Sequence, residues 1–305
     1  MRKIYNLLLL SIFMIGAASC SSDDDINVWD ATYVYLMPEH LGIYSAEYTL
    51  THKGDVIEGP ETKMQFYVAL NRALDRDVSI ELAVDTSKTL KLDMVNLSTK
   101  VVTIPAGQIK SELVQMSVED WSSETTIKEE TQYLAEVNLS KNKIKDVLVG
   151  NQSRLRMQVT KSALLNLESG APTEGKLIEN RAVWEITVQE GVENANNPGR
   201  LVDGNNSDLA VNSGGFWFIV NLTEPTLVTG IRTNFWGSGY AARGVEVFVS
   251  DNGVKWESQG QLRTSGAAQE IKFINPVTTK YIKYNITVGS QYNRLSVTEF
   301  NVYAK

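Results

Sequence analysis

The sequence predicts an all-β chain built from two successive β-sandwich domains. Short runs of alternating apolar and polar residues recur from about residue 26 to residue 162, where no stretch keeps the 3.6-residue period of an amphipathic helix, and alternating strands also recur in residues 181–305. The composition is 43% hydrophobic and 21% charged, which is typical of a folded protein. Glycine, proline and serine gather in residues 166–180, so this segment is expected to be a linker between the two domains.

The first residues have the pattern of an export signal. Arg2 and Lys3 precede an apolar run of about a dozen residues. This run is too short for a membrane-spanning helix, which needs about 20 residues. Small residues at 16–19 stand directly before Cys20, the only cysteine of the chain. We therefore expect a signal peptide over residues 1–19 and an acidic tether over residues 20–26.

The segment around Cys20 resembles a bacterial lipobox, in which the cysteine is acylated and becomes the new N-terminus. Serine and aspartate residues follow at 21–25, and this pattern resembles the surface-export signal of Bacteroidota lipoproteins. The resemblance implies that Cys20 is the lipidation site of an outer-membrane protein that faces the cell surface. The alternative is a free thiol beside an ordinary signal-peptidase site.

Residues 27–165 are expected to form the first sandwich. About seven strands in a segment of this size fit an Ig-like β-sandwich. The phrase Val-Thr-Ile-Pro-Ala-Gly at 102–107 resembles part of the N-terminal sandwich of Bacteroidota surface glycan-binding lipoproteins. The clearest predicted strands cover residues 66–70, 78–84, 100–104, 113–118, 133–139 and 155–160.

Charge and composition exclude several classes of function. The formal net charge is -7, from 29 Lys and Arg against 36 Asp and Glu, so no basic field attracts nucleic acid. One cysteine cannot form an intramolecular disulfide, and the two histidines, His40 and His52, leave little for a zinc site or a Ser-His-Asp triad. Two sandwiches also leave no room for a catalytic barrel. The chain is therefore not expected to be an enzyme.

Residues 181–305 carry an ordered series of landmarks. The turn Asp203-Gly204 is followed by an apolar strand from Trp217, a strand and turn at 244–253, and closing strands at 280–284 and 297–303. The series resembles a coagulation factor 5/8 type C (discoidin-like) domain, whose fold is shared with family 32 carbohydrate-binding modules. The resemblance implies a jelly-roll β-sandwich. Alternate residues of 245–249 and 282–288 are expected to face its core.

The resemblance also implies that loops at one end of this domain hold a sugar. A pyranose can lay its apolar face on an aromatic ring, while its hydroxyls need polar planar partners such as Arg and Asn. Trp184, Trp217 and Trp256 are predicted to be core residues, and the alternative for the loop aromatics is that they cap the barrel end. The candidate ligand-binding residues are Asn234, Trp236, Tyr240 and Arg243 in one loop and Tyr292, Asn293 and Arg294 in a second.

A structural Ca²⁺ is the cofactor that the resemblance implies. Asp203 and Glu299 match the family's carboxylate positions, and the alternative is a simple polar turn at Asp203.

The function predicted is a non-catalytic, lipid-anchored cell-surface protein that captures polysaccharide or glycoprotein glycan for an outer-membrane importer. The first alternative is an adhesion or scaffold lipoprotein that binds a protein or lipid surface. The second is glycoside hydrolysis by paired carboxylates.

Overall fold

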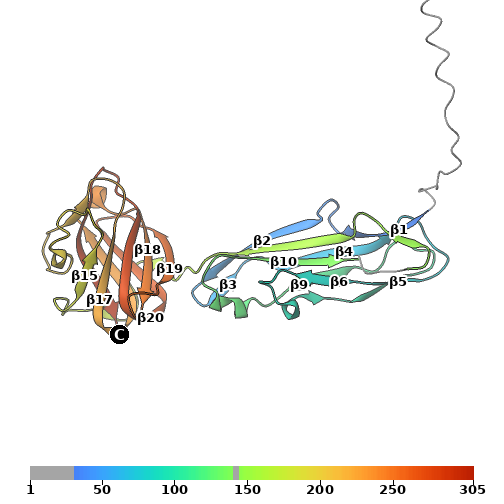
Figure 1. The fold of residues 1–305 in the computed structure, drawn as a ribbon, viewed down its shortest axis with the longest axis horizontal. Coiled ribbons are helices and arrows are strands. Elements are labelled where there is room, and N and C mark those ends of the chain that lie inside the picture. Colours follow the sequence, from blue (N-terminus) through green and yellow to red (C-terminus); the bar gives the residue numbers. More distant parts are fainter. Residues whose placement is uncertain (1–30, 140–143) are drawn as a thin grey trace, which may run out of the picture.

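The computed structural model describes residues 31–139 and 144–305, which form two β-sandwiches in succession (Figure 1). Strands and short 3-10 turns make up the regular structure of these residues, so the all-β prediction is confirmed. The part of the chain that the structure describes holds no helix that is long and apolar enough to cross a bilayer. The predicted signal peptide, tether and lipidation site at Cys20 lie outside the described residues.

The N-terminal sandwich consists of two five-stranded sheets. Their strand orders are β11-β1-β4-β9-β7 and β3-β2-β12-β10-β6, and β5 and β8 form a separate pair. The strands are β1 (Thr32–Pro38), β2 (Ser45–Lys53), β3 (Val56–Glu58), β4 (Thr62–Leu70), β5 (Val78–Glu81), β6 (Ala83–Thr86), β7 (Asn96–Leu97), β8 (Val101–Ile104), β9 (Val114–Val118), β10 (Thr131–Asn138), β11 (Val147–Val149) and β12 (Arg154–Lys161).

Period-two alternation places one face of each sheet in a shared core. Val34 and Leu36 of β1 are fully buried, and they belong to the same cluster as Val137 of β10 and Leu155 of β12 in the opposite sheet. Burial of one such side chain contributes about 1.5–3 kcal/mol to folding. The sandwich expected for residues 27–165 is therefore held together by apolar contacts between its two layers.

The segment 78–84, which was predicted to be one strand, is split between two sheets. β5 pairs with β8, whereas β6 pairs with β10. Leu82 lies between them, is buried, and donates its backbone N–H to the carbonyl of Lys100. The alternation of apolar residues in the sequence runs through the break, although the residues of β6 are only half-buried or exposed. The sequence pattern alone could therefore not show the change of partner.

The C-terminal sandwich is one continuous sheet of nine strands. Its main order is β14-β21-β17-β20-β18-β19, with β13 beside β20, β15 beside β17 and β16 beside β21. The strands are β13 (Leu167–Ser169), β14 (Lys176–Leu177), β15 (Glu185–Val188), β16 (Leu209–Val211), β17 (Trp217–Phe235), β18 (Gly244–Ser250), β19 (Glu257–Arg263), β20 (Ala268–Val288) and β21 (Leu295–Ala304).

The two longest strands, β17 and β20, pair with each other in an antiparallel register that shifts between Asn221 and Thr226. The expected inward faces are confirmed for Val245, Val247 and Val249, and for Ile282, Tyr284 and Ile286, all of which are buried in one cluster. Val288 differs, because it is the last residue of β20 and its side chain is 53% exposed.

The segment 166–180 differs from the linker that its composition predicted. β13 pairs with β20, and β14 pairs with β21, so these residues extend the C-terminal sheet. Asn166 is buried, and its side-chain amide donates to the side chain of Gln259 and to the carbonyl of Asn275, both at 2.9 Å. The glycine and proline residues form the turn between two short strands, and composition alone does not distinguish such a turn from a linker.

Candidate functional site

Three loops of the C-terminal sandwich surround a pocket of about 220 Å³. Residues 212–216 lead into β17, residues 236–243 connect β17 to β18, and residues 289–294 connect β20 to β21. The pocket therefore lies where loops from distant parts of the domain meet. Its lining residues are Ser213, Gly214, Arg243, Val288, Gly289, Ser290, Tyr292, Asn293 and Leu295.

Two glycines allow the backbones around the pocket to touch. A Cβ atom on Gly289 would stand 2.3 Å from the carbonyl oxygen of Gly214, and one on Gly215 would stand 1.9 Å from that of Ile286. Any side chain at these positions would overlap a main-chain oxygen, which cannot move without displacing its strand or loop. The shape of the pocket therefore depends on bare backbone at both positions.

Tyr292 is held against the neighbouring loop while much of its side chain remains in solvent. A Cβ atom on Gly239 would lie 2.1 Å from the Tyr292 ring, so the ring packs directly on that glycine. The backbone N–H of Tyr292 donates to the Gly239 carbonyl at 3.2 Å, and Tyr240 meets the ring edge-on at a centroid distance of 5.5 Å. Tyr292 is nevertheless 56% exposed. The aromatic pair is thus ordered before any ligand arrives.

Arg243 is the last residue of the loop before β18 and lines the pocket. Its backbone N–H donates to the Val288 carbonyl, and its own carbonyl accepts from the N–H of Thr264. The preceding residue, Ala242, is fully buried. These contacts fix the backbone of Arg243 while its side chain is exposed along the pocket wall.

Trp236 and Asn234 lie outside the pocket lining. Trp236 is 62% exposed, and its backbone N–H donates to the Ser296 carbonyl at 3.2 Å. Asn234 is half-buried near the end of β17, and its side-chain oxygen is buried without a hydrogen bond. Of the first predicted loop, Arg243 reaches the pocket itself and Tyr240 contacts its lining residue Tyr292.

Arg294 forms ion pairs with two carboxylates of the same domain. Its guanidinium lies 2.9 Å from Glu193 and 3.4 Å from Asp208. The hydrogen bond to Glu193 is the main reason that the pKa of Arg294 rises above its ordinary value, and the charge of Asp208 adds to it. Arg294 therefore braces the loop next to the pocket, and its donors are already in use.

The three tryptophans predicted to be core residues have different environments. Trp184 is only 8% exposed and belongs to the core cluster, so its prediction is confirmed. Trp217 and Trp256 are half-buried. The ammonium of Lys283 lies 5.0 Å from the centre of the Trp217 ring, a cation–π contact on the outer face of the sheet.

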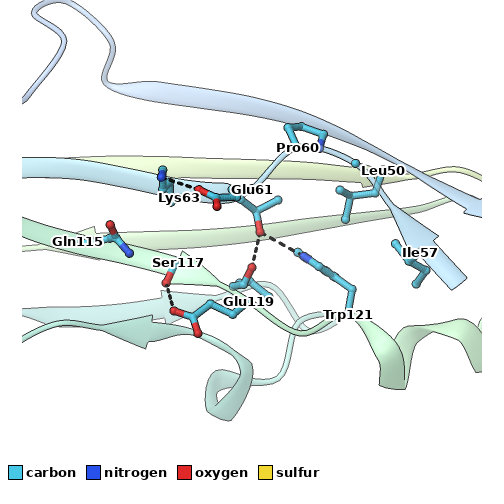
Figure 2. Close-up of a pocket in the computed structure, with 12 residues that line it drawn as sticks. Leu50, Ile57, Pro60, Glu61, Lys63, Gln115, Ser117, Glu119 and Trp121 are labelled. Atoms are coloured by element: carbon cyan, nitrogen blue, oxygen red, sulfur yellow. Dashed lines mark hydrogen bonds and ion pairs between the residues drawn. The ribbon is translucent and has the colours of Figure 1, made fainter.

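The N-terminal sandwich has a larger pocket, of about 520 Å³, between its two sheets (Figure 2). Glu61 and Glu119 line it, and glycoside hydrolysis by paired carboxylates would need one of them to act as a general acid. A general acid needs a raised pKa, whereas the hydrogen bond from Lys63 lowers the pKa of Glu61. The Trp121 indole is also occupied, because it donates to the Thr62 hydroxyl at 3.1 Å. The pocket thus gives the hydrolase alternative no support.

Two family models match the chain. Residues 185–300 match the model of the F5/8 type C domain, and this range includes the pocket and all three of its loops. The C-terminal domain is an F5/8 type C domain. Residues 1–72 match a second model, described as a domain of unknown function. None of the curated proteins compared with the chain matches it.

Some solved structures match most of the chain, and others match less than half of it. A two-domain protein of unknown function from Bacteroides fragilis is 14% identical, with a TM-score of 0.41, over 89% of this chain and 94% of its own. The F5/8 type C domain of a B. fragilis protein is 22% identical, with a TM-score of 0.38. The match covers 44% of this chain and 99% of that domain's chain. A family 32 carbohydrate-binding module from Clostridium perfringens, solved with GalNAc-β-1,3-galactose, is 16% identical, with a TM-score of 0.37. The match covers 42% of this chain and 100% of that module's chain.

Glu299, the predicted calcium ligand on the last strand of the F5/8 type C domain, is buried and already bound on both oxygens. Its Oε2 accepts a hydrogen bond from the Arg181 guanidinium at 2.5 Å, and its Oε1 accepts one from the backbone N–H of Gly204. Arg181 also donates to the carbonyl of Phe300 at 3.2 Å. A guanidinium cation therefore stands beside the carboxylate where the family resemblance placed calcium.

Asp203, the second predicted ligand, is exposed and caps its own turn. Its carboxylate accepts hydrogen bonds from the backbone N–H of Asn205 and the hydroxyl of Ser207. Partial burial acts to raise the pKa of Asp203, but these hydrogen bonds outweigh it and the pKa lies below its ordinary value. Ca²⁺ prefers about six to eight oxygen ligands. In residues 31–139 and 144–305, no three His, Cys, Asp or Glu side chains gather in a group suited to a metal. The residues present do not fit a calcium ion.

Sequence reasoning missed the part of the F5/8 type C pocket that consists of main chain and small residues. Ser213, Gly214 and Gly289 line the pocket but were not among the candidates, whereas Asn293 was a candidate and does line it. The Ser-Gly-Gly run at 213–215, directly before a strand, was the signal that pointed to this close backbone approach.

Proposed function

We propose that the F5/8 type C domain binds carbohydrate in the pocket between its three loops. The observation that carries the proposal is the Tyr292 ring, which is 56% exposed yet fixed by Gly239 and Tyr240. Arg243 and Asn293 line the same pocket and bring a guanidinium and an amide. An ordered aromatic surface beside planar polar groups suits a sugar, which has an apolar C–H face and a rim of hydroxyls.

The expected binding is weak. Each hydroxyl contact mostly replaces a contact with water, so the net gain per hydrogen bond is about 1 kcal/mol. The pocket is small, at about 220 Å³, and we expect a Kd between about 10 µM and 1 mM. Many copies at one cell surface would strengthen retention of a polymer that offers repeated sugars.

Replacing Tyr292 by alanine should weaken binding about 10-fold or more, because loss of an anchoring ring typically costs about 1–3 kcal/mol. The melting temperature should change little, because the ring is largely exposed. A glycan array with the full-length chain would identify a ligand, and calorimetry with that ligand would measure the effect.

Val254 provides the matched control, since it is 83% exposed in the turn between β18 and β19, outside the pocket. Val254→Ala should leave affinity unchanged.

Trp236→Ala should weaken binding of oligosaccharides more than of monosaccharides, because Trp236 lies beside the pocket rather than in it. Unchanged affinity of Tyr292→Ala for a confirmed glycan would place the site elsewhere. If protein or lipid ligands bind while glycans do not, the chain is an adhesion or scaffold protein instead.

The rest of the proposal concerns the setting of this site and is supported by sequence. The export pattern and small residues before Cys20 support a lipid anchor, and the serine and aspartate residues at 21–25 support display on the cell surface. There the protein would act without catalysis, capturing polysaccharide or glycoprotein glycan and passing it to an outer-membrane importer.

Cys20→Ala should move the protein from the membrane fraction to the soluble fraction, because stable anchoring depends on the attached acyl chains. Fractionation followed by immunoblotting measures this, and Ser21→Ala serves as the neighbouring control that keeps the thiol. A Cys20→Ala protein that still sediments with membranes would exclude lipidation at this residue.

A further inference from the structure

We propose that the sugar in this pocket is acidic, carrying a carboxylate as uronic and sialic acids do, and that Arg243 is its counter-ion. This inference deepens the proposed function and depends on it, because it assumes that the pocket binds carbohydrate.

The first observation is the charge of the pocket lining. Of the nine residues that line the pocket, Arg243 alone is charged. Ser213 and Asn293 add a hydroxyl and an amide, whereas the Ser290 hydroxyl is occupied by the carbonyls of Tyr292 and Arg294. A sugar carboxylate would therefore meet one positive charge and no carboxylate among the residues lining the pocket.

The second observation is that Arg243 is available. Its backbone is fixed through Val288 and Thr264, while its guanidinium has no ion pair or hydrogen bond within the part of the chain that the structure describes. Arg294, in the adjacent loop, shows the opposite arrangement, because Glu193 and Asp208 already engage it. Arg294 therefore holds the loop in place, whereas the guanidinium of Arg243 can bind a ligand.

The chemistry of the guanidinium then favours an anion over a neutral sugar. A guanidinium offers five donors and no acceptor, whereas a sugar hydroxyl both donates and accepts. A carboxylate accepts two parallel hydrogen bonds from the same group, and such charge-assisted bonds are about twice as strong as neutral ones. Arg294 with Glu193 and Asp208 carries one net negative charge nearby, so the preference for an acid should be moderate.

The experiment compares acidic oligosaccharides with neutral counterparts. The probes are trigalacturonic acid with its methyl ester, and a sialyllactose with lactose, each titrated into the full-length chain. The acidic member of at least one pair should bind about 3- to 10-fold more tightly at low salt. The preference should shrink when NaCl rises from about 50 mM to about 500 mM, because salt screens exposed charges.

Arg243→Gln should remove the preference by weakening the acidic member of each pair more than the neutral member. Lys255→Gln is the matched control, since it removes the same charge from an exposed residue in the turn at the other end of β18. Equal affinity for both members of every pair, or an equal loss for both in Arg243→Gln, would overturn the acidic-sugar inference and leave the proposed function standing. Absence of binding to every glycan on the array would instead overturn the proposed function itself.

Discussion

Replacing Arg181 by alanine should lower the free energy of unfolding of the F5/8 type C domain by about 3 kcal/mol, because it strands a buried carboxylate. The side chains of Arg181 and Glu299 are only 16% and 10% exposed, and their N and O atoms are 2.5 Å apart. Through Glu299 the pair also holds the N–H of Gly204, so it ties the segment before β15 and the turn at Asp203 to the last strand. Chemical denaturation of the full-length chain, followed by tryptophan fluorescence, would measure the loss.

Two further measurements separate this ion pair from a general effect of charge removal. Arg263→Ala removes an exposed arginine of the same domain and should change stability by less than about 0.5 kcal/mol. A chelator should leave the melting curve of the unsubstituted chain unchanged, because Arg181 supplies the cation beside Glu299. Stabilisation of that chain by added calcium would contradict this assignment.

The calcium expectation shows why a family pattern can locate residues without fixing their partners. The sequence correctly places Asp203 and Glu299 near one another, since the Gly204 N–H donates to Glu299. Arg181 lies 118 residues before Glu299, outside any motif around either carboxylate. Only the folded chain brings the guanidinium to the carboxylate, and its charge then disfavours a second cation there.

The same limit applies to the fold. Alternation identified which residues of 245–249 face the core, because side-chain direction in a strand has a period of two. It did not reveal that 78–84 is divided between two sheets, or that 166–180 adds β13 and β14 to the C-terminal domain. Strand partners are set by contacts between distant segments, and a local pattern does not encode them.

The sequence predicted several side chains of the candidate site, but not the main-chain segments that also line the pocket. Tyr292 and Arg243 were predicted and line the pocket. Arg294 was predicted as a ligand residue, but its donors face Glu193 and Asp208, a pairing across about a hundred residues of sequence that motif reading could not reveal. The glycines that shape the pocket have no side chain to suggest a role, although a Cβ added at Gly215 or Gly289 would overlap a main-chain oxygen.

Replacing Gly289 by alanine should therefore damage binding more than its small size suggests. The new Cβ would stand 2.3 Å from the Gly214 carbonyl oxygen, so the loops at 212–216 and 289–294 would have to separate. Overpacking of this kind costs about 1–3 kcal/mol of stability. Tyr292 and Asn293 follow directly in the displaced loop, and the affinity for the identified glycan should fall about 10-fold or more.

Gly199→Ala is the matched control for this prediction. Gly199 is an exposed glycine in the 3-10 turn Pro198–Leu201 of the same domain, and its nearest neighbour, the Asn197 side chain, would be an ordinary 3.7 Å away from the added Cβ. That variant should keep both its melting temperature and its affinity, so a selective loss in Gly289→Ala reports the contact between the loops. If Gly289→Ala instead binds the glycan as tightly as the unsubstituted chain, the ligand does not occupy the pocket that these loops enclose.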